Sequence, residues 1–278
     1  MPVQAVVFEL ILTGPPEITQ MSDTPFTYAT HPVDPRLQPW IRGVWTFTAG
    51  ADAPPEHHVP PDGTSALVLV ENPGAPRLIA HGPRVMPMVV PTVPGVTFRG
   101  LRLAAEAAPL LIGVDALDLV PGPVSVRRLG PVDAMDLIDA MRHTTPRDIA
   151  LAVDSLMLPH LEAMPPLDVV VQSALQVIRE TSGQAPLDEL AIRLGVSQRT
   201  LQRRVKHATA LTPKQHVRIA RFFAAALGML DPEHRISRIA IIGGYADQPH
   251  FHHEVAALTG LTPRELAQRV RQTTHLLE

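Results

Sequence analysis

LDELAIRLGVSQRTLQRRV at residues 187–205 and ISRIAIIGGYADQPHFHHEV at residues 236–255 are two copies of one pattern, and they decide the fold of the C-terminal part of the chain. The copies are offset by 49 residues at their start and by 50 residues further on. Each copy has an alanine four residues before a glycine, at Ala191 and Gly195 and at Ala240 and Gly244. Alanine lets two helices approach closely, and glycine permits a tight turn between them. The repeat therefore predicts two helix-turn-helix units.

The second helix of the first copy has a basic and amide-rich outer face. Ser197 is a good N-cap for this helix, and Leu201 and Val205, four residues apart, face the core. The outer face then carries Gln198, Arg199, Gln202, Arg203 and Lys206. Together with Ser197, these are the expected DNA-binding residues of the first unit. Arginine and glutamine are the side chains that read guanine and adenine edges in the major groove, so the pattern favours DNA binding. A solvated, arginine-rich face is the alternative interpretation.

Charge and proline divide the chain near residue 166. Residues 1–166 hold 10 arginines against 17 acidic residues, and residues 167–278 hold 14 basic against 10 acidic residues, which together give the net charge of −3. Most of the 30 prolines precede residue 132, where they prevent long helices. An acidic front part of short strands and a basic helical tail are expected, and the tail's charge suits a polyanion such as DNA.

The front part contains β-strand patterns followed by helical ones. Strands are expected at Trp40–Thr48, Ser65–Val70 and Val85–Val96, with a turn at Pro61–Gly63. Two apolar helical faces follow, formed by Val132, Met135, Leu137, Ile138 and Met141, and by Ile149, Val153, Leu156, Met157 and Leu161. These helices either pack on the sheet or form a dimer interface.

The composition excludes several classes of protein. The chain has no cysteine, which excludes disulfides, cysteine-ligated metals and thiol nucleophiles and makes the cytoplasm the expected compartment. No apolar run approaches the roughly 18–20 residues that span a bilayer, so no membrane association is expected. The pair His57-His58 and the set His250, His253 and Glu254 could bind a metal ion, but structural or DNA-facing roles explain them better. We expect no catalytic residues, no metal and no cofactor.

Residues 167–270 resemble the DNA-binding domain of the AraC/XylS family of bacterial transcription regulators. The matching segments are LAIRLGVSQRTLQRRV, LTPKQHVRIAR and IAIIGGYADQPHFHHEVAALTGLTPREL. The resemblance implies recognition helices that start near Ser197 and Asp247, and a helix from about Lys214 to Leu230 that holds them apart. It adds DNA-binding positions in the second unit, at Gln248, His250, His252 and His253.

The second unit departs from the family pattern. His253 stands where the family usually has arginine, Val255 replaces a usual aromatic residue, and Pro249 occupies a usual serine or alanine position. From residue 231 onward there are five basic and six acidic residues. The second unit therefore either binds DNA weakly or serves mainly as a folding partner of the first.

The expected fold class is α+β. Residues 1–21 would be an N-terminal extension that could be disordered, because nothing in them matches the resemblance. Residues 22–130 would form a β-rich sensing domain, a cupin-like barrel or sandwich, since RLQPWIRGVWTF, PPDG and GVTFRG are similar to sensors found ahead of such tails. Residues 131–166 would be a helical segment and linker, and residues 167–274 the all-α DNA-binding domain.

The sequence thus predicts a DNA-binding transcription regulator and no enzyme, controlled by a ligand or by dimerisation through the front domain. Trp40, Trp45, Phe47 and Phe98 either line a ligand pocket or belong to the core. The partners implied are operator DNA, RNA polymerase, a small-molecule effector and a second copy of the chain. The alternative function is a cupin-like, metal-dependent enzyme with a helical C-terminal domain.

Overall fold

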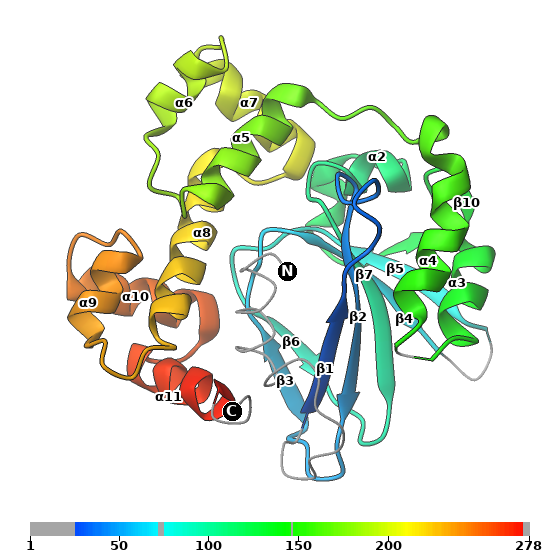
Figure 1. The fold of residues 1–278 in the computed structure, drawn as a ribbon, viewed down its shortest axis with the longest axis horizontal. Coiled ribbons are helices and arrows are strands. Elements are labelled where there is room, and N and C mark those ends of the chain that lie inside the picture. Colours follow the sequence, from blue (N-terminus) through cyan, green and yellow to red (C-terminus); the bar gives the residue numbers. More distant parts are fainter. Residues whose placement is uncertain (1–25, 72–74, 146, 275–278) are drawn as a thin grey trace.

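The computed structural model describes residues 26–71, 75–145 and 147–274 (Figure 1). The expected extension at residues 1–21 lies outside the described residues. In the described part of the chain, no helix is long and apolar enough to cross a membrane.

An antiparallel six-stranded sheet forms the centre of the front part, with the strand order β1-β2-β7-β4-β5-β8. Its strands are β1 Phe26–His31, β2 Ile41–Ala49, β4 Ser65–Val70, β5 Arg77–His81, β7 Thr97–Leu103 and β8 Val124–Val126. Two small two-stranded sheets accompany it, one of β3 Glu56–Val59 with β6 Met88–Pro91, and one of β9 Arg128–Leu129 with β10 Val132–Asp133.

The sheet is open, so the expected barrel is wrong. Among the described strands, β1 and β8 are the two edges and do not pair with each other. Instead of further strands, helices α3 Ala134–Arg142 and α4 Ile149–Met157 lie against one face of the sheet, beside β5 and β2 (Figure 1). The remaining elements of the front part are α2 Ala108–Ile112 and two short 3-10 helices, η1 Ala116–Leu119 and η2 Leu158–Ala163.

Strand alternation gives the sheet two apolar faces with different surroundings. In β4, Leu67 and Leu69 are buried in a core shared with α3 and α4, and Ala66, Val68 and Val70 line a cavity on the other face. Successive side chains of a strand point to opposite faces, which is why one short apolar strand serves both. The predicted strand Ser65–Val70 is confirmed.

Two details of the expected front part are wrong. Only Met88–Pro91 of the expected strand Val85–Val96 forms a strand. Val132 lies in strand β10 ahead of the helix, and Met135 is 52% exposed, so neither belongs to the buried face of α3. Asp133 begins α3 as its N-cap, because its side chain accepts a hydrogen bond from the Met135 N–H.

The C-terminal part is all helical. Its helices are α5 Val169–Glu180, α6 Leu187–Arg193, α7 Gln198–Thr209, α8 Pro213–Gly228, α9 Ile236–Ile242, α10 Gln248–Thr259 and α11 Pro263–Thr274. Helices α6 and α7 form the first helix-turn-helix unit, α9 and α10 form the second, and α8 runs between them (Figure 1). The second helix of each unit, α7 or α10, begins where the resemblance implied, after Ser197 and after Asp247.

The repeat holds in atomic detail. Ala191 and Ala240 are both buried, and Gly195 and Gly244 both have positive φ, 67° and 70°. Glycine adopts this backbone region at little cost, which explains its place in each turn. At the far end of each unit, Thr209 and Thr259 accept a hydrogen bond from the amide two residues later, at 3.2 and 3.1 Å. The two units are therefore built alike from turn to C-cap.

Candidate functional site

The outer face of α7 carries the predicted DNA-binding side chains, all of them exposed. These are Gln198, Arg199, Gln202, Arg203 and Lys206. Ser197 is exposed too, but its side chain caps the helix, because its Oγ accepts a hydrogen bond from the Thr200 N–H at 3.1 Å. The opposite face is anchored by Leu201 and Val205, which are at most 1% exposed. Helix α7 thus exposes a face of arginine, lysine and glutamine side chains, while its opposite face is packed in the core.

An ion pair fixes α7 against α5. Arg204 donates two hydrogen bonds to the carboxylate of Asp168, at 2.6 and 2.8 Å, and Asp168 is also the N-cap of α5. Burial alone would raise the pKa of Asp168, but the hydrogen bonds from Arg204 and from the amides of α5 outweigh burial and lower it. Arg204, which sequence reasoning did not single out, therefore positions α7 and is not part of its outer face.

Three of the eight basic residues between 193 and 221 hold the fold together. Besides Arg204, Arg218 of α8 forms an ion pair with Glu254 of α10, and the Arg221 Nε donates to the Gly183 carbonyl oxygen at 3.1 Å. Arg193, Arg199, Arg203, Lys206 and Lys214 are exposed. The exposed positive charge of this stretch therefore lies mainly on α7.

Helix α10 presents a different surface at the same positions. The expected DNA-binding residues of this unit, Gln248, His250, His252 and His253, are exposed. The ring of His250 nevertheless packs edge-on against Tyr245, with the ring centroids 5.4 Å apart. Pro249 lies in the first turn of the helix, where proline is tolerated. The outer face of α10 therefore has no arginine or lysine, in contrast to α7.

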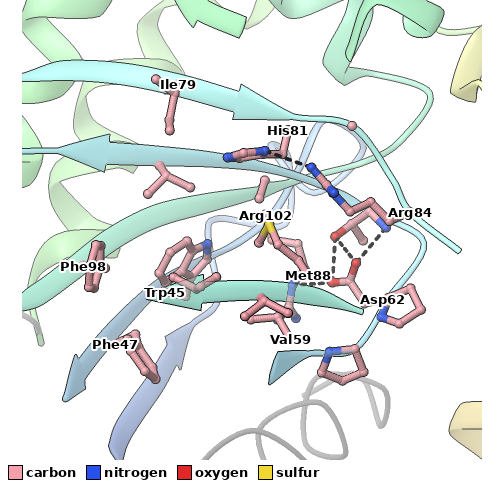
Figure 2. A pocket seen from close by; sticks show the side chains of 18 of the residues that line it. Trp45, Phe47, Val59, Asp62, Ile79, His81, Arg84, Met88, Phe98 and Arg102 are labelled. Carbon is pink, nitrogen blue, oxygen red and sulfur yellow. Dashed lines mark hydrogen bonds and ion pairs between the residues drawn. The ribbon is translucent and has the colours of Figure 1, made fainter. Parts of the chain in front are cut away.

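A cavity of about 460 Å³ lies on the face of the sheet away from α3 and α4. Strands β2, β4, β5 and β7 form its floor, and β3 and β6 with the segments around them cover it. Trp45, Phe47 and Phe98 line it, together with Val59, Met88 and other apolar side chains (Figure 2). Gly100, opposite Trp45 in the register, leaves room for the indole, since a Cβ there would lie 2.3 Å from Trp45 Cζ2.

One side of the cavity is polar. Arg102 Nε lies 3.1 Å from Asp62 Oδ2, and Thr64 Oγ1 also bonds to this carboxylate. Arg84 Nη2 lies 3.4 Å from His81 Nδ1. Figure 2 shows Asp62, Arg84 and Arg102 on the side away from Phe47 and Phe98. Burial, and then the charge of Arg84, lowers the pKa of His81, so this imidazole is neutral at pH 7. Sequence reasoning saw Asp62 only as part of a turn and missed Arg84 and Arg102.

Trp40 does not line the cavity, contrary to the pocket interpretation. It packs on the core between the sheet and α3–α4, and its Nε1 donates to the Pro165 carbonyl oxygen at 2.9 Å. The other three aromatic residues fit both expected roles, pocket lining and core. All three line the cavity, and Phe47 also belongs to a buried apolar cluster against which Trp45 and Phe98 pack.

That cluster joins the cavity wall to the second helix-turn-helix unit. Phe47 and Ala49 of β2 share one buried cluster with Phe222 of α8, Phe251 of α10 and other apolar residues of the C-terminal part. At the turn before β4, Gly63 faces His216 and Ile219 of α8. The first unit has a separate core, formed by Val171, Ala174, Leu175, Ile178, Leu190, Ala191, Leu201, Val205 and Ala220.

Within the described residues, no group of three or more histidine or acidic side chains is placed to hold a metal ion.

A family model described as a helix-turn-helix domain matches residues 190–269, which span both units. The C-terminal part of the chain is therefore a helix-turn-helix domain. It is 32% identical over 81 residues to the HTH-type transcriptional activator RhaS of Escherichia fergusonii, a match that covers 29% of each chain. The family-model match lies within residues 167–270, which resemble the AraC/XylS family.

The solved structures to which this chain is similar include a Chromobacterium violaceum transcriptional regulator described as having an AraC-type DNA-binding domain. That similarity covers 37% of this chain and 93% of the other, at 23% identity and a TM-score of 0.35. An apo form of ToxT from Vibrio cholerae is similar over 90% of this chain and 100% of its own, at 9% identity and a TM-score of 0.42.

Proposed function

We propose that the protein is a sequence-specific, DNA-binding regulator of transcription, and that its first helix-turn-helix unit carries most of the DNA affinity. The observation that carries this proposal is the outer face of α7. It places arginine and glutamine side chains in solvent on a helix held by a buried apolar stripe and the Arg204–Asp168 pair. A recognition helix needs this combination, because its side chains must be free to reach the base edges in the major groove while the helix itself stays in a fixed position.

Within this function the chain would divide as follows. Residues 22–130 would sense a small-molecule effector, residues 131–166 would close that domain and link it, and residues 167–274 would bind DNA. The RNA polymerase contact and the homodimer belong to the same proposal. Exposed Met135 of α3 and Leu151 of α4 support a homodimer formed through these helices.

Two contacts support control by a ligand in the cavity. At one side, Phe47 lines the cavity and belongs to the cluster that includes α8 and α10. At the other side, the N–H of Gly82, which also lines the cavity, donates to the Leu119 carbonyl oxygen of η1 at 2.9 Å, and η1 lies against α7. A ligand that moves either wall would therefore move residues packed on a recognition helix.

The DNA-binding part is tested with a fragment that the protein itself selects from random-sequence DNA. Arg203→Ala should weaken binding by about 1–3 kcal/mol, the range for a good base contact. The matched control is Arg127→Ala, an exposed arginine of the front part, which should bind as the parent does. Equal affinity of the Arg203→Ala variant and the parent would contradict the assignment of α7.

The salt dependence of the same binding reaction tests how much each helix-turn-helix unit contributes to the DNA affinity. The slope of log K against log salt should change by about 0.9 for each phosphate that a variant no longer neutralises. Lys206→Ala should make the slope less steep by about 0.9, the contribution of one phosphate contact. The double variant His252→Ala/His253→Ala should change the slope by less than this. A larger reduction in the histidine variant would place the main contact on α10 and overturn the proposed order of the units.

A further inference from the structure

The polar side of the cavity has an excess of positive charge. Among the described residues that line it, the ionisable side chains are Asp62, His81, Arg84 and Arg102. Asp62 pairs with Arg102, and the two side chains are 18% and 13% exposed. No described carboxylate forms an ion pair with Arg84, whose Nη2 instead contacts the neutral His81. One positive charge is therefore left without an opposite charge beside a mainly apolar space.

Arg84 also has a hydrogen-bond donor without an acceptor. Its Nε is buried, and no described residue accepts a hydrogen bond from it. A buried donor left unpaired is costly, so each such group in a native protein calls for an explanation, and a bound acceptor is one. A guanidinium can donate from two nitrogens to both oxygens of a carboxylate, and this geometry suits Arg84 better than a neutral partner does.

The backbone holds the Arg84 segment in place before any ligand arrives. Gly82 packs closely on Leu119, where a Cβ would lie only 2.8 Å from Leu119 Cβ, and the Gly82 amide is bonded to the Leu119 carbonyl. On the other side of the cavity, Trp45, Phe47 and Phe98 offer aromatic surface with no charged group between them (Figure 2). The site therefore has an apolar compartment and a fixed cationic end.

We infer that the cavity binds an apolar monocarboxylic acid, with its chain or ring among the aromatic side chains and its carboxylate on Arg84. The inference rests on the proposed control by a ligand and names the chemical class of that ligand. Asp62 keeps Arg102 neutralised, so a second acidic group on the ligand would meet no free cation among the described lining residues. Amines would be repelled by Arg84, and neutral alcohols would leave its charge uncompensated.

The test compares three probes with one chain and different head groups, namely decanoate, decanol and decylamine, below their aggregation limits. The chain has two tryptophans, and Trp40 lies outside the cavity, so a Trp40→Phe background leaves Trp45 as the reporter of cavity occupancy. In this background, decanoate should bind at least tenfold more tightly than decanol and should quench or shift Trp45 fluorescence. Decylamine should bind more weakly than decanol.

Arg84→Gln should remove the preference for decanoate and leave decanol affinity unchanged, which also shows that the cavity still folds. Arg84→Lys should keep part of the preference. Arg77→Gln, at an exposed position of β5 outside the cavity lining, should change neither affinity. Equal binding of decanoate and decanol, or a preference that survives Arg84→Gln, would overturn the inference.

Binding to the selected DNA fragment is measured separately, with and without decanoate. A parent protein that binds no DNA would contradict the proposed function even if decanoate occupies the cavity as expected. If decanoate changes the DNA affinity of the parent protein but not that of Arg84→Gln, the result would support both the proposed function and the inferred carboxylate site. The fluorescence result alone decides whether the cavity is specific for a carboxylate.

Discussion

Single residues set the shape of the cavity and the stability of the helical part. Gly100 of β7 is an example, because a Cβ there would meet both the Trp45 indole and the Leu67 carbonyl oxygen at 2.3–2.4 Å. His216 of α8 is another. It is buried, and its Nε2 lies 3.0 Å from Thr209 Oγ1, so it joins α8 to the end of α7.

Gly100→Ala should destabilise the protein by about 1–3 kcal/mol, the usual cost of overpacking, because the Leu67 backbone cannot move aside freely. Gly122→Ala is the matched control. A Cβ at Gly122 would meet nothing within 4 Å, so this change should stay within about 0.5 kcal/mol of the parent. Urea unfolding followed by Trp fluorescence measures both, and equal midpoints would show that the strands can separate to admit a methyl group.

The stability of the helical part should fall with acid through His216. Burial, and then the charge of Arg179, lowers the pKa of His216 to about 3, whereas the unfolded chain has the ordinary value near 6.5. Because the folded state keeps the neutral imidazole, its contribution is complete above pH 6.5 and is lost as the pH falls towards 3. The loss should be at most about 1.4 kcal/mol per pH unit.

His216→Gln should flatten this pH dependence between about pH 6.5 and 5, with a lower stability than the parent at about pH 8, where both side chains are neutral. Unfolding free energies at each pH, followed by helical circular dichroism, provide the measurement. Parallel curves for parent and variant across the range would show that His216 does not carry the pH dependence.

At the scale of elements, the two helix-turn-helix units use opposite charges at one position. Arg204 of α7 pairs with Asp168 at the start of α5, and its equivalent in α10, Glu254, pairs with Arg218 of α8. Helix α7 is thus tied to α5, and helix α10 to α8. The sign of the charge at this position matches the partner on the neighbouring helix, α5 for α7 and α8 for α10. It is therefore not a measure of DNA binding.

A double-mutant cycle of Arg204→Gln and Asp168→Asn measures the first of these ties. Asparagine keeps the N-cap of α5, so the cycle isolates the ion pair. The two side chains are 35% and 32% exposed, and we expect a coupling of about 0.2–1 kcal/mol that weakens in high salt. A coupling of zero would mean that packing alone sets the position of α7.

The helical elements could be predicted from the sequence, whereas the cavity could not. Alanine, glycine and threonine recur at fixed spacing in the two units, and local rules convert that spacing into turns and caps. The cavity depends on β7 lying between β2 and β4, a long-range pairing that no local pattern contains. Strand alternation could not have placed Trp40 either, because Trp40 precedes β2 and the register of β2 shifts between Ile41 and Gly43.

Over the whole molecule, the apolar clusters do not follow the sequence division near residue 166. The second unit shares its cluster with β2, and the first unit has its own. Helix α8 contributes Ala220 to the first unit's cluster and Phe222 to the shared one. The cooperative units of the protein should therefore cross the proposed domain boundary.

Hydrogen exchange can detect these units. Phe47→Ala should lower amide protection in α10 as well as in β2 and leave α6 and α7 close to the parent. The matched change in the first unit, Val171→Ala, should lower protection in α6 and α7 and leave β2 unaffected. A fall in protection confined to β2 after Phe47→Ala would mean that the shared cluster does not couple the stability of β2 to that of α10.

The shared cluster has a practical consequence for protein engineering. A chimera that joins residues 1–166 to the DNA-binding domain of another regulator would lack the C-terminal partners of Phe47 and Ala49. The graft would expose apolar surface, and we expect such a hybrid to be poorly soluble unless the facing residues of α8, α10 and α11 are transplanted with it. The portable module would be the first helix-turn-helix unit, whose core is complete without the sheet.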